Sequence, residues 1–211
     1  MTEGMRKKLI PLLQKMGYDE QDAEGWFNLG RQLFDEYKLD EAEVAYRAVV
    51  ELEPANADAW RDLGATFFLR NRNDEAETAF KTGIQCEPTD ADLWYNLGCV
   101  YNADDRIDEA VEAFQSALEY NPEDPDILCN LGTVLRVAGK NHEAESMLKG
   151  AIEIRPDNVV PWLNLIQLLY AEEREEEAER MYDDALIRAP EIEHFIDSIT
   201  DLITKKQEED E

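Results

Sequence analysis

Apolar and small residues recur along the chain at the spacing of an amphipathic helix. Within residues 57–90 they follow spacings of three and four, first from Trp60 to Phe68 and then from Ala76 to Ile84. A polar stretch separates the two runs. Residues three and four apart share one face of a helix. The pattern therefore predicts two helices that are joined by a short turn and pack through their apolar faces.

The same pattern occurs five times with a period of 34 residues. Proline marks the end of the second helix in each unit, because it lacks a backbone donor. These prolines are Pro54, Pro88, Pro122, Pro156 and Pro190. An Asp or Asn stands before each first helix, where its side chain can accept the free N–H groups of the first turn. These expected N-caps are Asp22, Asn56, Asp90, Asp124 and Asn158.

Small residues occupy matching positions in both helices of each unit. In the first helix, glycine follows a leucine at Gly30, Gly64, Gly98 and Gly132. In the second helix, alanine recurs at Ala42, Ala76, Ala110, Ala144 and Ala178. Small side chains at the contact let two helices approach closely. Ile166 replaces the glycine in the fifth unit, so we expect looser or shifted packing there.

The combined pattern resembles the tetratricopeptide repeat. It runs Trp-x2-Leu-Gly-x2-aromatic in the first helix, followed by Ala, an aromatic residue and Pro in the second. The resemblance implies an all-α fold, a right-handed α-solenoid of stacked helix-turn-helix repeats. The expected repeats are residues 23–56, 57–90, 91–124, 125–158 and 159–192. Residues 1–22 are expected to form an N-terminal capping helix, and residues 193–211 a C-terminal capping helix with a short acidic tail.

Both ends of the chain carry apolar residues suited to capping. The apolar run that follows Arg6, Lys7 and Lys8 is too short for a signal peptide, so we expect a capping helix there. Near the other end, one apolar stripe would cover the fifth repeat. The stripe consists of Ile192, Phe195, Ile196, Ile199, Leu202 and Ile203. No apolar run approaches the ~20 residues of a membrane span, so we expect no membrane insertion.

The formal net charge of −28 narrows the choice of partners. Binding to a phosphate backbone needs Lys and Arg, so nucleic acid is not an expected partner. Two explanations of the acidity remain open. Acidic outer helices can keep the protein soluble, for instance in a salt-rich cytoplasm, or they can attract a basic partner.

The residue types that carry enzyme chemistry form no recognisable site. Cys86, Cys99 and Cys129 have no paired spacing, which favours reduced thiols in the cytoplasm. His142 and His194 are the only histidines, and they give no metal-binding pattern. No phosphate-binding loop or nucleophile motif occurs. We therefore expect no catalytic residue, no metal and no cofactor.

The resemblance also implies where a partner binds. First helices of this family line a concave groove, and an asparagine before the leucine often holds a peptide backbone, to which a carboxamide offers both a donor and an acceptor. That position holds Asn28, Asp62, Asn96, Asn130 and Asn164. The other groove candidates are Phe27, Arg31, Arg61, Tyr95, Arg136, Gln167 and Tyr170. The alternative is that these asparagines belong to the bare repeat consensus and serve packing or turn contacts.

These features favour a non-catalytic adaptor or scaffold that binds a peptide segment of another protein. The alternatives are a secretion or assembly chaperone that holds an aggregation-prone client, and a regulatory subunit of an enzyme complex. Some family members hold a C-terminal carboxylate with a Lys/Asn/Lys/Arg clamp. This chain lacks the clamp, because Arg31 and Arg61 replace only part of it and Asp62 would repel a carboxylate.

Overall fold

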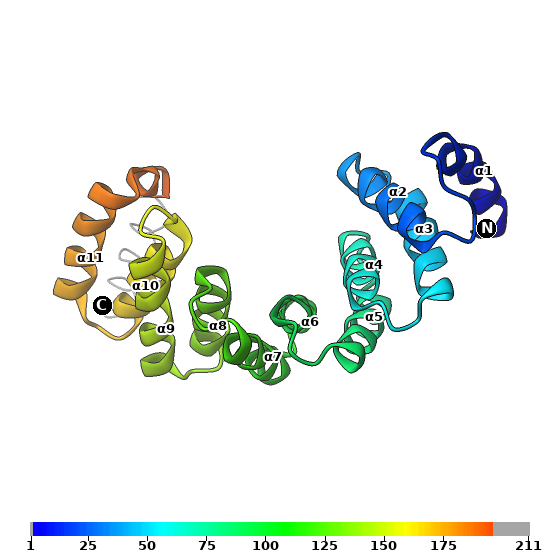
Figure 1. Cartoon of the computed structure of the whole chain (residues 1–211). Helices are drawn as coiled ribbons and strands as arrows, with labels where there is room; N and C mark the ends of the chain where they lie inside the picture. Colours follow the sequence, from blue (N-terminus) through cyan, green and yellow to red (C-terminus); the bar gives the residue numbers. More distant parts are fainter. Residues whose placement is uncertain (1, 196–211) are drawn as a thin grey trace. The chain divides into compact units, whose positions relative to one another are not determined.

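The computed structural model describes residues 2–195, and every regular element among them is a helix (Figure 1). The predicted all-α fold of consecutive helix pairs is confirmed. The N-terminal helix is α1 (Thr2–Lys15). The first helices of the pairs are α2 (Ala23–Asp35), α4 (Ala57–Leu69), α6 (Ala91–Ala103), α8 (Pro125–Val137) and α10 (Val159–Ala171). The second helices are α3 (Leu39–Leu52), α5 (Asn73–Cys86), α7 (Ile107–Tyr120), α9 (Asn141–Ile154) and α11 (Glu175–Arg188).

The chain divides into two compact units, Met1–Arg106 and Ile107–Glu211. In the first unit α2 packs on α3 and α4 on α5, and α1 lies against α3. In the second unit α8 packs on α9 and α10 on α11. Large apolar side chains such as Trp26 and Phe80 are almost fully buried between the helices of the first unit. Leu148 and Leu165 have the same role in the second.

The expected N-caps are present at all five first helices. Asp22, Asn56, Asp90, Asp124 and Asn158 have extended backbones, and their side chains accept N–H groups of the following turn. For example, Asp90 Oδ1 accepts from the N–H of Asp92 at 2.8 Å. Each cap satisfies donors that a helix start leaves unpaired, so the beginnings of these helices are determined by local chemistry.

The turn inside each helix pair contains a residue in the left-handed region. These residues are Tyr37, Asn71, Asp105, Gly139 and Glu173, again 34 apart, with φ between 55° and 74°. In the first turn the N–H of Lys38 bonds to the carbonyl of Leu33, and the N–H of Tyr37 to that of Phe34. This pairing of backbone groups is the Schellman motif, which ends a helix at a left-handed residue.

The glycines of the first helices permit close approach of the second. A Cβ on Gly30 would lie 2.8 Å from the Tyr46 ring, and one on Gly64 would lie 2.6 Å from the Phe80 ring. Ile166 is fully buried at the corresponding position of α10. The α10–α11 pair is packed less closely than the α4–α5 and α8–α9 pairs, in agreement with the expectation for the fifth repeat.

A recurring tryptophan ties α4, α6 and α10 to the preceding turn, whereas α8 has Leu128 at this position. The indole N–H of Trp60 donates to the carbonyl of Pro54 at 2.8 Å, and that of Trp94 donates to Pro88 at 2.9 Å. Trp162 donates in the same way to the carbonyl of Pro156. The tryptophan therefore combines an apolar body with a donor that satisfies a carbonyl freed by the helix stop.

The two ends of the described chain lie against their neighbouring helices. Leu9 and Leu13 of α1 are buried, while Leu12 remains half exposed. After α11 the chain forms a 3₁₀-helix, η1 (Pro190–Phe195), whose Ile192 is fully buried. The rest of the predicted apolar stripe, from Ile196 onward, lies outside the described residues. Within residues 2–195 no helix is both long and apolar enough to cross a membrane.

Candidate functional site

The first-helix face of the first unit carries the predicted carboxamide row on α2 and α6. Asn28 is half-buried, and its Nδ2 lies 3.4 Å from the hydroxyl oxygen of Tyr18 as a long hydrogen bond. Asn96 is also half-buried, and its side chain makes no hydrogen bond to any described residue. Asp62 interrupts the row on α4. The three side chains thus share a register but differ in their bonding.

A hollow of about 220 Å³ opens between α2 and α4 on this face. It is lined by Arg31, Phe34, Asp35, Tyr46, Asp62 and Ala65. Burial raises the pKa of Asp62, although the cations Arg61 and Arg31 act in the opposite direction. Burial and the neighbouring Asp62 carboxylate raise the pKa of Tyr46. The hollow is therefore a mixed site in which a carboxylate is held in a partly desolvated position.

Two of the predicted groove residues in this unit are engaged within the chain. The Phe27 ring packs edge-on against Tyr46, with centroids 6.0 Å apart. Arg61 forms ion pairs with Asp58 at 2.6 Å and with Asp90 at 2.8 Å. Arg31 is exposed, and Tyr95 is half-buried. Phe27 and Arg61 therefore contribute to internal packing, whereas Arg31 is accessible to a ligand.

In the second unit the asparagines on the first helices bond to their own chain. Nδ2 of Asn130 donates to the carbonyl of Asp126 at 3.0 Å, one turn earlier on α8. Nδ2 of Asn164 donates to the hydroxyl of Thr133 at 2.9 Å, which joins α10 to α8. The alternative to peptide binding was that these asparagines serve packing or turn contacts. The bonds of Asn130 and Asn164 are contacts of that kind. Gln167, Tyr170 and Arg136 are half-buried on the same two helices.

Ion pairs connect the second helix α3 to the turn between α4 and α5. The Glu43 carboxylate accepts from Arg47 at 2.9 Å, from Arg72 at 2.5 Å and also from Arg70. The guanidinium carbons of Arg47 and Arg72 lie 5.2 and 4.6 Å from the centroid of the Phe67 ring. A buried carboxylate and an aromatic ring thus share the same cations.

The arrangement recurs along the chain. Glu77 pairs with Arg106 and Lys81, each at 2.6 Å, and Glu145 pairs with Arg174 at 2.6 Å. These three Glu–Arg pairs all span 29 residues. These pairs were not among the predicted contacts, although the shared separation of Glu and Arg is visible in the sequence. At the corresponding position of α7 stands Val111, which is buried and carries no charge.

The pKa values of the carboxylates reflect these pairs. Burial of Glu77 acts to raise its pKa, but the hydrogen bonds from Arg106 and Lys81 outweigh it, and the pKa lies below its usual value. The hydrogen bond from Arg174 lowers the pKa of Glu145 to about 2. Both groups are therefore ionised in the folded protein at neutral pH and can hold their ion pairs there.

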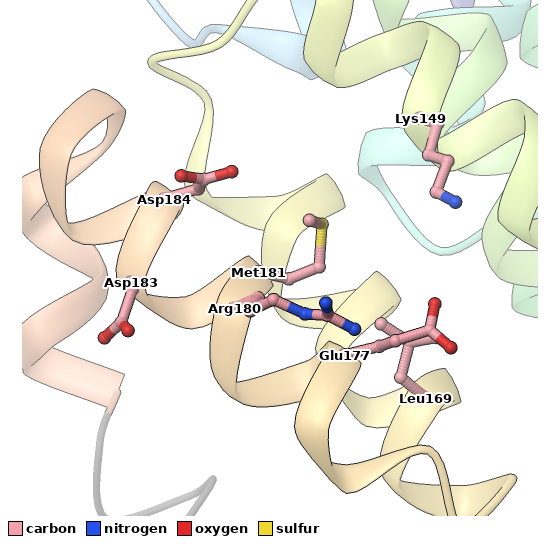
Figure 2. A pocket seen from close by; sticks show the side chains of 7 residues that line it. All are labelled: Lys149, Leu169, Glu177, Arg180, Met181, Asp183 and Asp184. Atoms are coloured by element: carbon pink, nitrogen blue, oxygen red, sulfur yellow. The ribbon is translucent and has the colours of Figure 1, made fainter.

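A second hollow, of about 510 Å³, lies between α9 and α11 (Figure 2). It is lined by Lys149, Leu169, Glu177, Arg180, Met181, Asp183 and Asp184. Leu169 holds the register position that Phe67 fills in the second repeat, so a smaller side chain stands where a ring fills the space there. Both signs of charge line this hollow, and all its lining residues except Leu169 lie on the second helices α9 and α11.

The described residues offer no site for a metal. No three His, Cys, Asp or Glu side chains among them are grouped to hold an ion. The three cysteines are free thiols. Burial raises the pKa of Cys99 and of Cys129 to about 11, so these two thiols stay protonated near neutral pH.

Comparisons with known families agree with this architecture. The family model of the cytochrome c-type biogenesis protein H TPR domain matches residues 74–194, and a tetratricopeptide repeat model matches residues 33–97. No curated protein sequence matches the chain.

Three solved structures illustrate the likeness. The crystal structure of MamA protein is 21% identical over 82% of this chain and 94% of its own, with a TM-score of 0.73. YrrB, described as a TPR protein with an unusual peptide-binding site, is 24% identical over 90% of this chain and 94% of its own, with a TM-score of 0.70. The pilF protein of Pseudomonas aeruginosa is 21% identical over 79% and 76%, with a TM-score of 0.71. At these identities the likeness shows the fold alone.

Proposed function

The chain belongs to the tetratricopeptide repeat family, and we propose that it is an adaptor that binds a peptide segment of another protein on its first-helix faces. The family supports the coarser part, a protein-interaction scaffold. Peptide binding on the first-helix faces is supported by a contrast between the second helices and the first. Glutamates of the second helices pair with arginines in the turn before the next second helix, as in the Glu43–Arg72 and Glu145–Arg174 pairs. The first-helix faces retain half-buried polar groups such as Asn96 and Arg136 that make no hydrogen bond within the described chain.

A peptide in an extended conformation suits these groups. Its backbone presents N–H and C=O groups along one edge, which a carboxamide can match with one acceptor and two donors. A half-buried polar group without a partner favours such a ligand, because binding replaces a missing hydrogen bond. The free thiols support a reducing cytoplasm as the place where the protein acts.

The test uses Asn96, whose side chain makes no hydrogen bond to any described residue. The partner segment is first identified by affinity capture from the native lysate with mass spectrometry, and then synthesised. Asn96→Ala should bind it about fivefold more weakly, since the lost contact costs about 1 kcal/mol. Its melting curve should change little. Calorimetry measures the affinity.

The matched control removes a carboxamide from a second helix of the same unit. Gln85 is exposed on α5. Gln85→Ala should bind the segment as the wild type does. If Asn96→Ala and Gln85→Ala bind equally, Asn96 has no part in recognition.

A second candidate function is favoured by the family match. The name of the model that matches residues 74–194 refers to cytochrome c-type biogenesis, an assembly process. By analogy, this chain would hold a client protein during assembly. Substoichiometric or stoichiometric suppression of client aggregation, without capture of one defined segment, would favour this chaperone role over the adaptor role.

A further inference from the structure

Arg136 is a half-buried cation without a partner in the described chain. It lies in the last turn of α8. Its Nε is inaccessible to solvent and makes no hydrogen bond. An unpaired donor that is shielded from water costs free energy, more so when it belongs to a charged group. Such a group is retained only where something outside the described structure uses it, or where the charge serves the helix.

Other arginines in comparable positions are all paired. Each of the remaining half-buried arginines among residues 2–195 forms an ion pair with a carboxylate. They are Arg6, Arg47, Arg61, Arg70, Arg72, Arg106 and Arg174. Acidic residues outnumber basic ones by 49 to 21 in the chain. A shortage of acidic residues therefore does not explain why Arg136 has no acidic partner among the described residues.

Arg136 shares a helix face with residues that join α8 to α10. It stands three residues after Thr133, and residues three apart are neighbours on a helix surface. The hydroxyl of Thr133 accepts the hydrogen bond from Asn164 on α10. The same register on α10 holds Gln167 and Tyr170, both half-buried. Arg136 thus belongs to the first-helix face of the second unit, where the proposed peptide would lie.

We propose that Arg136 binds the carboxylate of an Asp or Glu side chain in the bound segment. This inference rests on the proposed function and adds the chemistry of one ligand residue. The two terminal nitrogens of a guanidinium present a fork of N–H groups that matches the two oxygens of a carboxylate, and these nitrogens of Arg136 are not shielded as its Nε is. A side chain fits better than a chain end, because α10 continues the same face beyond α8 and the segment can extend past Arg136.

The other explanation of Arg136 is its charge at the end of α8. A cation in the last turn stabilises a helix through the helix dipole. Lysine supplies that charge as well as arginine does, but it lacks the planar fork. Arg136→Lys therefore separates the two roles, and Arg136→Gln removes both.

The binding test needs no known partner. The probe is a bead-displayed library of random nine-residue peptides that are acetylated at the N-terminus and amidated at the C-terminus, so that Asp and Glu side chains are their only carboxylates. The wild type should enrich Asp or Glu at one register position. Arg136→Gln and Arg136→Lys should each lose that enrichment by about tenfold, as expected for a bidentate charge-assisted contact. Arg188→Gln, which removes an exposed arginine of α11, should keep it.

The outcomes separate this inference from the proposed function. Acidic enrichment that persists in Arg136→Gln, or peptides selected without any acidic preference, would overturn the assignment of Arg136 alone. Acidic preference that appears only in a library with free C-termini would overturn the choice of a side chain. A wild type that selects no peptide at all would overturn the proposed function, and the role of Arg136 with it.

A stability measurement on the free protein gives a second readout. Arg136→Met removes the unpaired donor and keeps an apolar stem, so the melting temperature should stay the same or rise by a few degrees. Arg174→Met is the matched control, and its melting temperature should fall because Glu145 loses its partner. A fall of similar size in Arg136→Met would mean that Arg136 is already bonded in the free protein, which would overturn the proposal.

Discussion

The guanidinium of Arg174, in the turn before α11, holds both carboxylate oxygens of Glu145 on α9. The two contacts measure 2.6 and 3.0 Å. This bidentate pair joins the second helix of the fourth repeat to the turn of the fifth. Glu43 with Arg72 and Glu77 with Arg106 make the corresponding connections in the first unit. The repeats therefore share an ion pair at equivalent positions as well as a hydrophobic core.

Loss of the Glu145 charge should destabilise the second unit in a pH-dependent way. The pKa of Glu145 falls from 4.5 to about 2 on folding, so its ionised form stabilises the fold. The full contribution, about 1–3 kcal/mol for a partly exposed pair, should be present above pH ~4.5. It should disappear as the pH falls towards 2.

The measurement compares the unfolding free energies of the wild type and Glu145→Gln at pH 7, 4 and 2.5. The difference should be largest at pH 7 and shrink at each step. A difference that is constant over this range would show that the carboxylate charge is not what stabilises the fold.

The Glu43 carboxylate should contribute far more to the unfolding free energy than an exposed carboxylate on the same helix. Its side chain is 9% exposed and it pairs with three arginines, so Glu43→Gln leaves half-buried cations without this counter-charge. We expect a loss of about 3 kcal/mol. Glu51→Gln is the control, because Glu51 is 62% exposed in its pair with Arg6, and it should cost less than about 1 kcal/mol. Denaturant unfolding measures both, and equal losses would contradict the argument.

Glycine in the first turn should stabilise the protein. Tyr37 has a φ of 58° and its side chain is 70% exposed, so it has a strained backbone with little packing to lose. Tyr37→Gly should raise the unfolding free energy by about 0.5–1 kcal/mol. At the equivalent position Gly139 has a φ of 74°, and Gly139→Ala should lower it by a similar amount. Thermal melts should show a higher melting temperature for Tyr37→Gly and a lower one for Gly139→Ala. A destabilised Tyr37→Gly would exclude backbone strain at this position.

Removal of η1 should loosen the fifth repeat first. Ile192 is fully buried where η1 meets α10 and α11. A chain ending at Pro190 loses this side chain, worth about 1.5–3 kcal/mol of burial. Hydrogen exchange should then rise in residues 159–188 while residues 23–106 keep their protection. A chain ending at Phe195 is the control, because it keeps Ile192. Equal protection of residues 159–188 in both chains and in the wild type would show that neither segment acts as a cap.

The helix starts and pair packing were predictable because their causes are local or periodic. Asp90 caps α6 through N–H groups two and three residues away, a contact that any helix start offers. Gly64 is small because the Phe80 ring lies against it, and the same pair of positions recurs in other repeats. At such positions the residue type reflects a single contact, so the sequence is enough to predict that contact.

The candidate groove was less predictable because its positions carry several roles. Asn130 and Asn164 share a register, yet one bonds to its own helix and the other to a threonine on the neighbouring helix. Which partner each carboxamide bonds to depends on the groups within hydrogen-bonding distance in the folded chain. The register of the repeat does not specify that distance. Phe27 was likewise a groove candidate from its register, and it packs against Tyr46.

The sequence by itself determined the helix pairs, their caps and their period, because helices form from contacts three and four residues apart and proline and Asx residues end and begin them. Only the tertiary structure decided which polar groups neutralise one another. Glu145 and Arg174 are 29 residues apart and meet because stacking brings α9 beside the turn before α11. The same stacking leaves the Nε of Arg136 without a hydrogen-bond partner in the described part of the chain, although acidic residues are abundant in the sequence. Charge composition sets how many partners exist, and packing geometry sets which of them can be reached.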